Sequence, residues 1–197
     1  MVIMAAVEGL VDEAVIRRLA EYVGVQVGQV YGKNGKDHLR QRIGAYNNAA
    51  RISPWIVLVD LNHEAECAPP LRDAWLHQPA PTMCFRVAVR EVESWLLADR
   101  GRLARFLRVP ISRVPTTPEA IEDPKRALVE LAARSRRRDI REDMVPRPGS
   151  GRTVGPAYAS RLIEFVGTHW NPEVAAGSSD SLRRCLVRLR EMGRCHP

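Results

Sequence analysis

Acidic side chains follow three apolar runs of the sequence, at the point where each run ends. Glu8 comes directly after the first run and Asp60 closes the second, while Glu91 and Glu93 follow the third. Parallel strands end at one edge of a sheet, so we expect these carboxylates to lie close together. Each of them alone is also typical of the first turn of a helix. Their repetition after three successive runs favours a shared site.

A cluster of carboxylates is stable when something offsets their mutual repulsion, and a divalent cation does so. Oxygen ligands without histidine or cysteine favour Mg²⁺ or Mn²⁺ over zinc. Pairs of such ions hold the attacking and leaving oxygens in phosphoryl transfer. The sequence therefore predicts a Mg²⁺ or Mn²⁺ site for phosphodiester chemistry. Its ligands would include Glu8, Asp60 and Glu91, and either Glu93 or Glu8 would handle a proton.

Lys125 is one of three lysines in a chain with 27 arginines, and it follows Asp123 and Pro124 at the start of an expected helix. A cation is electrostatically disfavoured at a helix N-terminus, which suggests a specific role. We interpret Lys125 as a group that stabilises negative charge on a phosphate, with a solvated surface lysine as the alternative. The other two lysines, in the segment GKNGK, lack the spacing of a P-loop and are expected to be exposed in a turn.

Strand-like and helix-like patterns alternate through the first half of the chain. Apolar or alternating runs at 2–7, 25–31, 55–60 and 83–89 indicate strands, and amphipathic segments separate them. This alternation predicts an α/β domain over residues 1–98, with a small and mostly parallel sheet flanked by helices.

The second half, residues 99–197, has helical patterns and no strand pattern. They cover 123–135, 158–170 and 178–192, and a loop rich in Gly, Pro and Ser lies at 147–156. We expect an all-helical extension packed on the first domain.

Positive charge is concentrated in the second half of the chain. The first 98 residues hold 10 basic and 11 acidic side chains, and the remainder holds 20 basic and 12 acidic ones. This asymmetry favours a nucleic acid, either DNA or RNA, as partner of the basic half. An arginine-rich composition that merely coats helices is the alternative.

Four arginines are the candidates for contact with a nucleic-acid backbone. Arg136, Arg137 and Arg138 form the centre of a dense basic run that we place at the C-terminal end of a helix, where cations suit the helix dipole. The same side chains suit phosphate contacts with salt-dependent affinity. Arg152, in the glycine-containing loop, is the fourth.

Several stretches resemble the motif set of TOPRIM domains, in which a Glu-Gly after the first strand and an Asp-x-Asp after a later strand bind divalent metal. These stretches are VEGLVDEAV, WIVLVDLN and VREVESWLLAD. The chain is more closely similar to a prokaryotic family called domain of unknown function 4276. That family is TOPRIM-like and similar to the nuclease domain of overcoming-lysogenization-defect proteins. The similarity runs from Val7 to about Leu186.

The resemblance implies a metal-dependent nuclease with a TOPRIM-like sheet. By matching position, it assigns metal binding to Glu8, Asp60 and either Glu91 or Glu93, with Asp12 as a further acid. It also implies a role in prokaryotic DNA metabolism or in defence against mobile elements. Members of the family are often found near ATPase genes, which implies an ATPase as partner.

The chain departs from the family pattern at one position, because the second Asp of the pair is Asn62. An amide oxygen still binds cations, but the loss of one negative charge weakens the site. Glu64 or Glu66 would compensate if the following loop folds back. Asn62 favours a second interpretation, in which the chain is a non-catalytic nucleic-acid- or protein-binding subunit with a degenerate metal site.

Other classes of protein are not expected. No apolar run approaches the roughly 20 residues of a membrane helix, and the first residues lack the basic segment of a signal peptide. The four cysteines contain no CxxC pair and no spacing typical of a disulfide framework. We therefore expect a cytoplasmic protein with reduced thiols and no membrane partner.

Overall fold

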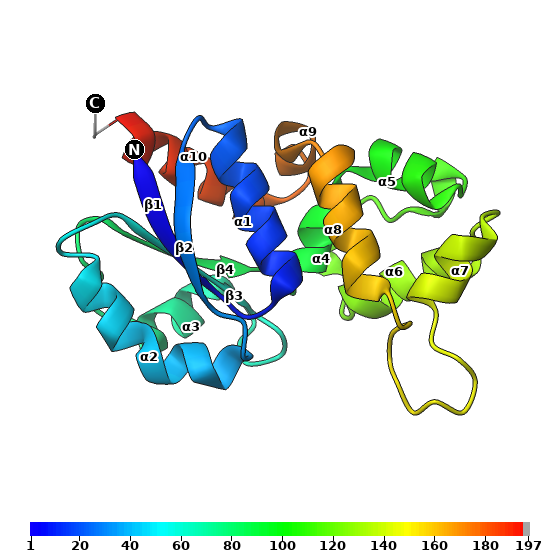
Figure 1. Cartoon of the computed structure of the whole chain (residues 1–197), viewed down its shortest axis with the longest axis horizontal. Coiled ribbons are helices and arrows are strands. Elements are labelled where there is room, and N and C mark those ends of the chain that lie inside the picture. The colour runs from blue at the N-terminus through cyan, green and yellow to red at the C-terminus, as the bar shows by residue number, and fades with distance from the viewer. Residues whose placement is uncertain (195–197) are drawn as a thin grey trace.

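In a computed structural model that describes residues 1–194, the chain folds into a four-stranded sheet with helices on both faces and a helical C-terminal part (Figure 1). All neighbouring strands are parallel, and their order is β2-β1-β3-β4. The α/β class predicted from the alternating patterns is confirmed. The strands are β1 (Val2–Val7), β2 (Gln26–Gly32), β3 (Trp55–Asp60) and β4 (Met83–Ala88).

Helices flank the sheet and make up the remainder of the fold. Those of the first half are α1 (Leu10–Tyr22), α2 (Lys36–Ala49), α3 (Ala68–Trp75) and α4 (Val92–Ala98). Those of the C-terminal part are α5 (Arg100–Leu107), α6 (Pro124–Ala133), α7 (Arg138–Met144), α8 (Tyr158–Thr168), α9 (Pro172–Ala176) and α10 (Asp180–Arg194). Two 3₁₀ turns lie at Ile111–Arg113 and Pro118–Ala120. Within the described chain, no helix is long and apolar enough to cross a membrane.

The two faces of the sheet are buried by different helices, because side chains alternate along a strand. Val57 of β3 packs in a cluster with Leu39 of α2 and Trp75 of α3. Ile56, its neighbour in sequence, belongs to the opposite cluster with Val15 of α1 and side chains of the C-terminal part. The sheet is thus the middle of three layers, which explains why its strands are nearly continuous apolar runs.

The direction of the chain through the sheet reverses between β1 and β3. From β1 the chain passes to β2 at one edge, and it returns to β3 on the other side of β1 before it reaches β4. Such a reversal opens a crevice at the carboxyl ends of the two central strands, where α/β proteins bind their ligands. Glu8 directly follows β1 and Asp60 is the last residue of β3.

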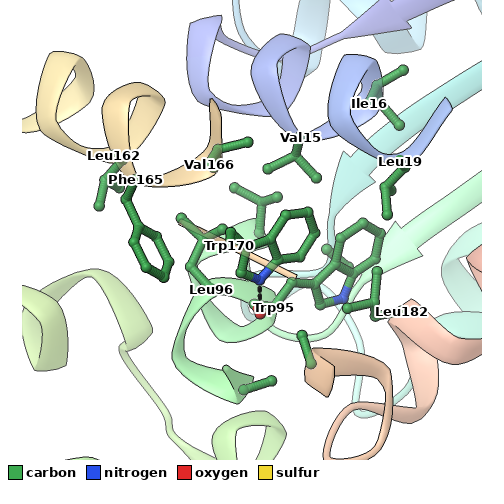
Figure 2. Packing of buried hydrophobic residues seen from close by; sticks show 14 of the residues in the cluster. Val15, Ile16, Leu19, Trp95, Leu96, Leu162, Phe165, Val166, Trp170 and Leu182 are labelled. Atoms are coloured by element: carbon green, nitrogen blue, oxygen red, sulfur yellow. Dashed lines mark hydrogen bonds between the residues drawn. The ribbon is translucent and has the colours of Figure 1, made fainter. Parts of the chain in front are cut away.

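Two buried tryptophans join the helical part to the α/β part (Figure 2). Trp95 of α4 and Trp170, just after α8, are both fully buried. The indole N–H of Trp170 donates to the Trp95 carbonyl at 3.1 Å, and the indole N–H of Trp95 donates to Ser181 Oγ at 2.7 Å. Val15 of α1 and Phe165 of α8 belong to the same cluster. One apolar core therefore runs through both halves of the chain.

The arginine run connects two helices, and its expected place at the end of one helix is wrong. Helix α6 ends at Ala133 and α7 begins at Arg138. Between them the buried Ser135 hydroxyl donates to the Leu107 carbonyl at 2.5 Å and accepts the Arg137 N–H at 3.0 Å. A serine that bonds to backbone groups competes with helical hydrogen bonds, so the helix stops here.

The loop over residues 146–156 connects α7 to α8 and is closed at its base. The Gly155 N–H donates to the Met144 carbonyl at 3.0 Å, and the Ala157 N–H donates to the Asp143 carbonyl at 2.9 Å. A Cβ atom on Gly155 would lie 2.4 Å from the Asp143 carbonyl oxygen, so the closure requires glycine. The segment is an Ω-loop, whose two ends lie side by side.

Candidate functional site

Glu8 and Asp60 meet in the crevice between β1 and β3. The Asp60 N–H donates to Glu8 Oε1 at 2.7 Å, and Asp60 Oδ1 accepts the N–H of Val92, the first residue of α4, at 2.9 Å. The strand-end acids are therefore brought together. Asp60 also serves a helix N-terminus, which is the structural role that an isolated strand-end Asp suggests.

Asp12 adds a buried carboxylate from the first turn of α1. Its Oδ2 atom accepts the Gly9 N–H at 2.9 Å, while its buried Oδ1 atom has no hydrogen-bond partner within residues 1–194. Burial, with the nearby charges of Glu93 and Glu8, raises the pKa of Asp12 to about 7. An unpartnered buried carboxylate oxygen is costly, and a proton or a cation removes that cost.

Glu91 and Glu93 face Lys125 at the N-terminus of α6. The Lys125 ammonium lies 3.4 Å from Glu91 Oε1 and 3.8 Å from Glu93 Oε1, and the Lys125 N–H donates to Glu91 Oε2 at 3.2 Å. Lys125 thus lies in the first turn of a helix as expected, with its ammonium beside two acids. Burial would lower the pKa of Lys125, but Glu93 and Glu91 raise it above its usual value.

Tyr158, the first residue of α8, completes the surroundings of Glu93. Its buried hydroxyl donates to Glu93 Oε1 at 3.3 Å. Burial raises the pKa of Glu93, and Lys125 opposes this shift. Burial and the charge of Glu93 raise the pKa of the Tyr158 hydroxyl, which remains a hydrogen-bond donor. Sequence reasoning missed this contact because a Tyr at helical spacing carries no sign of a polar partner.

The carboxylates raise one another's proton affinity. Burial raises the pKa of Asp60 well above its ordinary value, and the charges of Asp12, Glu93 and Glu8 raise it further. Burial also raises the pKa of Glu8, although the Asp60 N–H and Lys36 lower it. The site therefore holds more negative charge than its lysines and backbone donors offset.

Lys36 is a second cation at the site, and the expectation that both lysines of the GKNGK segment are exposed is wrong for it. Only 12% of its side chain is exposed, and Nζ donates to the Asp60 carbonyl at 2.5 Å. Nζ also lies 2.7 Å from Glu64 Oε1, so the loop after β3 does fold back, as considered above, while Glu66 is exposed. The signal in the sequence was a cation in the first turn of a helix, as at Lys125.

The glycines of the GKNGK segment allow it to lie against the end of β1. Gly32 has φ of +85°, and a Cβ atom there would lie 2.3 Å from the Val7 carbonyl oxygen. The Gly35 N–H donates to the Glu8 carbonyl at 3.1 Å. This close approach of two backbones carries Lys36 into the crevice.

A pocket of about 650 Å³ opens beside the acids. Asn62, Glu91 and Lys125 lie in its wall, and Thr153 reaches it from the Ω-loop. The Asn62 N–H donates to the Arg90 carbonyl at 2.8 Å, and the Arg90 guanidinium donates to the Asn62 carbonyl at 3.1 Å. The pocket thus presents a cation and polar groups next to the carboxylate cluster. Its remaining lining residues are His63, Arg90, Glu122, Asp123 and Arg126.

The four arginines expected to contact nucleic acid do not line this pocket. Arg138 pairs with Glu142 at 2.7 Å, and Arg137 pairs with Asp139. Arg136 and Arg152 are exposed. The basic run is therefore partly neutralised by its own neighbours, and only some of its charge is available to a partner.

The described part of the chain has no three His, Cys, Asp or Glu side chains arranged to hold a metal ion as they stand. Backbone N–H groups and Lys125 already occupy several carboxylate oxygens of the cluster. Comparison of the chain with family models, with curated proteins and with solved structures gives no match. What the protein does must therefore be inferred from the geometry and charge of this site.

Proposed function

We propose that this protein is a Mg²⁺- or Mn²⁺-dependent phosphodiesterase acting on nucleic acid, a nuclease or a related enzyme of TOPRIM type. The observation that carries the proposal is the buried and unpartnered Oδ1 atom of Asp12, among carboxylates whose pKa values are raised. An all-oxygen donor set fits a hard divalent cation. Glu8, Asp12 and Asp60 would hold it, with Asn62 and Glu91 at the side of the pocket.

The side chains around the cluster suit the remaining tasks of phosphodiester cleavage. A bound divalent ion would supply Lewis-acid polarisation of the phosphoryl group. The Lys125 ammonium, which lines the pocket, would offset negative charge on the phosphate. Glu93 or Glu8 would accept or donate a proton, and the Tyr158 hydroxyl would keep Glu93 Oε1 in place.

The setting of this activity is part of the same proposal. Basic residues Arg136, Arg137, Arg138 and Arg152 would contact the phosphate backbone of DNA or RNA. We infer a cytoplasmic protein that acts in prokaryotic DNA metabolism or defence, with an ATPase as partner.

A second candidate function is a nucleic-acid- or protein-binding subunit without catalytic activity. Asn62 favours it, because that position lacks the carboxylate that a stronger metal site would have. The backbone donors that already satisfy Glu8 and Asp60 favour it as well, since they stabilise the cluster without a metal.

Cleavage of labelled single- and double-stranded DNA and RNA in Mg²⁺, Mn²⁺ or EDTA tests the proposed activity. We expect cleavage in at least one metal and none in EDTA. Asp60→Asn should lower the rate by about 100-fold or more, because it removes a metal ligand. Asn62→Asp should raise metal affinity and rate by restoring a charge.

Asp99→Asn is the matched control. Asp99 is a buried carboxyl that accepts the Asn171 N–H at 2.9 Å, outside the acid cluster. Its loss is expected to lower the melting temperature while any metal-dependent cleavage persists. If neither the parent nor Asn62→Asp cuts any substrate in either metal, the enzyme is ruled out in favour of the binding subunit.

A further inference from the structure

A second hollow, of about 720 Å³, lies between the C-terminal end of α5 and the link from α6 to α7. We call it the arginine pocket, after the four arginines in its lining. No acidic side chain of the described residues lines it. The lining that matters here is Arg105, Arg108, Arg136 and Arg137 around the apolar Val109 and Ile111.

Most of the positive charge in the arginine pocket is not neutralised by the protein. Within residues 1–194, Arg105, Arg108 and Arg136 form no ion pair, and Arg137 alone pairs, with Asp139. Arg126 and Arg138, by contrast, each pair with a carboxylate one turn further along their own helix. Guanidinium groups that share a pocket repel one another, so an anion bound among them is stabilised.

The two walls of the arginine pocket are held together by the protein itself. The buried Ser135 hydroxyl donates to the Leu107 carbonyl at 2.5 Å, and the Arg136 N–H donates to the Arg108 carbonyl at 3.5 Å. Arg108 ends α5 in the left-handed conformation, with φ of +53°. Because these contacts exist before any ligand arrives, binding does not have to order the walls.

The apolar floor narrows the chemistry of the ligand. Val109 is buried, and Ile111 is 53% exposed at the mouth of the pocket. Phosphate alone has no use for an apolar floor, and a duplex keeps its bases stacked inside. A single strand offers both a phosphate backbone and bases that can lie on apolar or guanidinium surfaces.

We propose that the arginine pocket binds single-stranded nucleic acid, with phosphates on the guanidinium groups and an unstacked base against Ile111. The proposal rests on the proposed function in taking nucleic acid as the ligand. It names a binding site separate from the acid cluster, and its binding needs no metal.

Fluorescence anisotropy of a labelled oligothymidylate in EDTA, over a series of salt concentrations, tests the arginine pocket. Arg105→Gln combined with Arg136→Gln should weaken binding by about tenfold or more and reduce the salt slope by about 1. Both side chains are exposed and unpaired among the described residues, so the melting temperature should not change. Ile111→Ala should weaken binding severalfold and leave the salt slope as it is.

Arg42→Gln combined with Arg51→Gln is the matched control. Both arginines are exposed on or just after α2, without an ion pair in the described chain, and the change in net charge is the same. This variant should bind like the parent. Equal weakening by both pairs, no binding by the parent, or equal affinity for a duplex would each overturn the proposal. Binding that passes these tests in a protein that cuts nothing would refute only the proposed catalysis.

Discussion

Asp12→Asn should make the metal-free protein more stable at pH 8 and nearly insensitive to pH. In the folded chain the pKa of Asp12 is about 7, against an ordinary value of 3.8. Between these two values the folded state holds a proton that the unfolded chain has lost, so stability falls as pH rises through this window. Each pH unit of the window is worth about 1.4 kcal/mol, which gives a loss of up to about 4 kcal/mol for the parent. Asparagine has no such proton to lose and can still accept the Gly9 N–H.

Urea unfolding at pH 5 and pH 8 in EDTA measures this effect. The parent should lose stability between the two values, Asp12→Asn should lose much less, and Mg²⁺ should restore the parent alone. Asp180→Asn is the control with the opposite sign. The exposed Asp180 pairs with Arg183 and Arg184, which lower its pKa, so its contribution is present at high pH and lost in acid. If Asp12→Asn is as pH-sensitive as the parent, the proton is held elsewhere.

Trp170→Ala should lower the free energy of unfolding by about 3–5 kcal/mol, because it empties the space of a large and fully buried side chain. The Trp95 carbonyl also loses its indole donor. Since one core runs through both halves, far-ultraviolet circular dichroism and tryptophan fluorescence should report the same unfolding transition in the variant.

Tyr22→Ala is the comparison for a partly exposed aromatic. Tyr22 is 38% exposed at the end of α1, so its loss should cost no more than about 1 kcal/mol. Two separate transitions in Trp170→Ala would show instead that the sheet and the helical part unfold independently.

The sequence was informative where residues follow directly from strand geometry. The strands needed only short apolar runs, and the contact between Glu8 and Asp60 followed from the rule that parallel strands end at one edge. Lys125 was located because a helix N-terminus with Asp and Pro before a cation is a local pattern. All these features depend on a few consecutive residues.

Features that depend on distant segments could not be predicted in this way. Helices α5, α7 and α9 have 8, 7 and 5 residues, too few to show a helical period. Lys36 reaches Asp60 only because two glycines let its loop lie on β1, and Tyr158 reaches Glu93 from 65 residues away. Ser135 divides the arginine run through a hydrogen bond to α5, which no local pattern reveals.

The closed base of the Ω-loop lets the chain be cut without being taken apart. Arg147 and Arg152 are exposed within the loop, so trypsin would be expected to nick the backbone there. The segment after the nick begins α8, which packs on α1, and it contains Trp170. We expect the two fragments to co-elute in gel filtration under native conditions. The same loop is the natural point at which to insert a reporter domain or to open new termini by circular permutation.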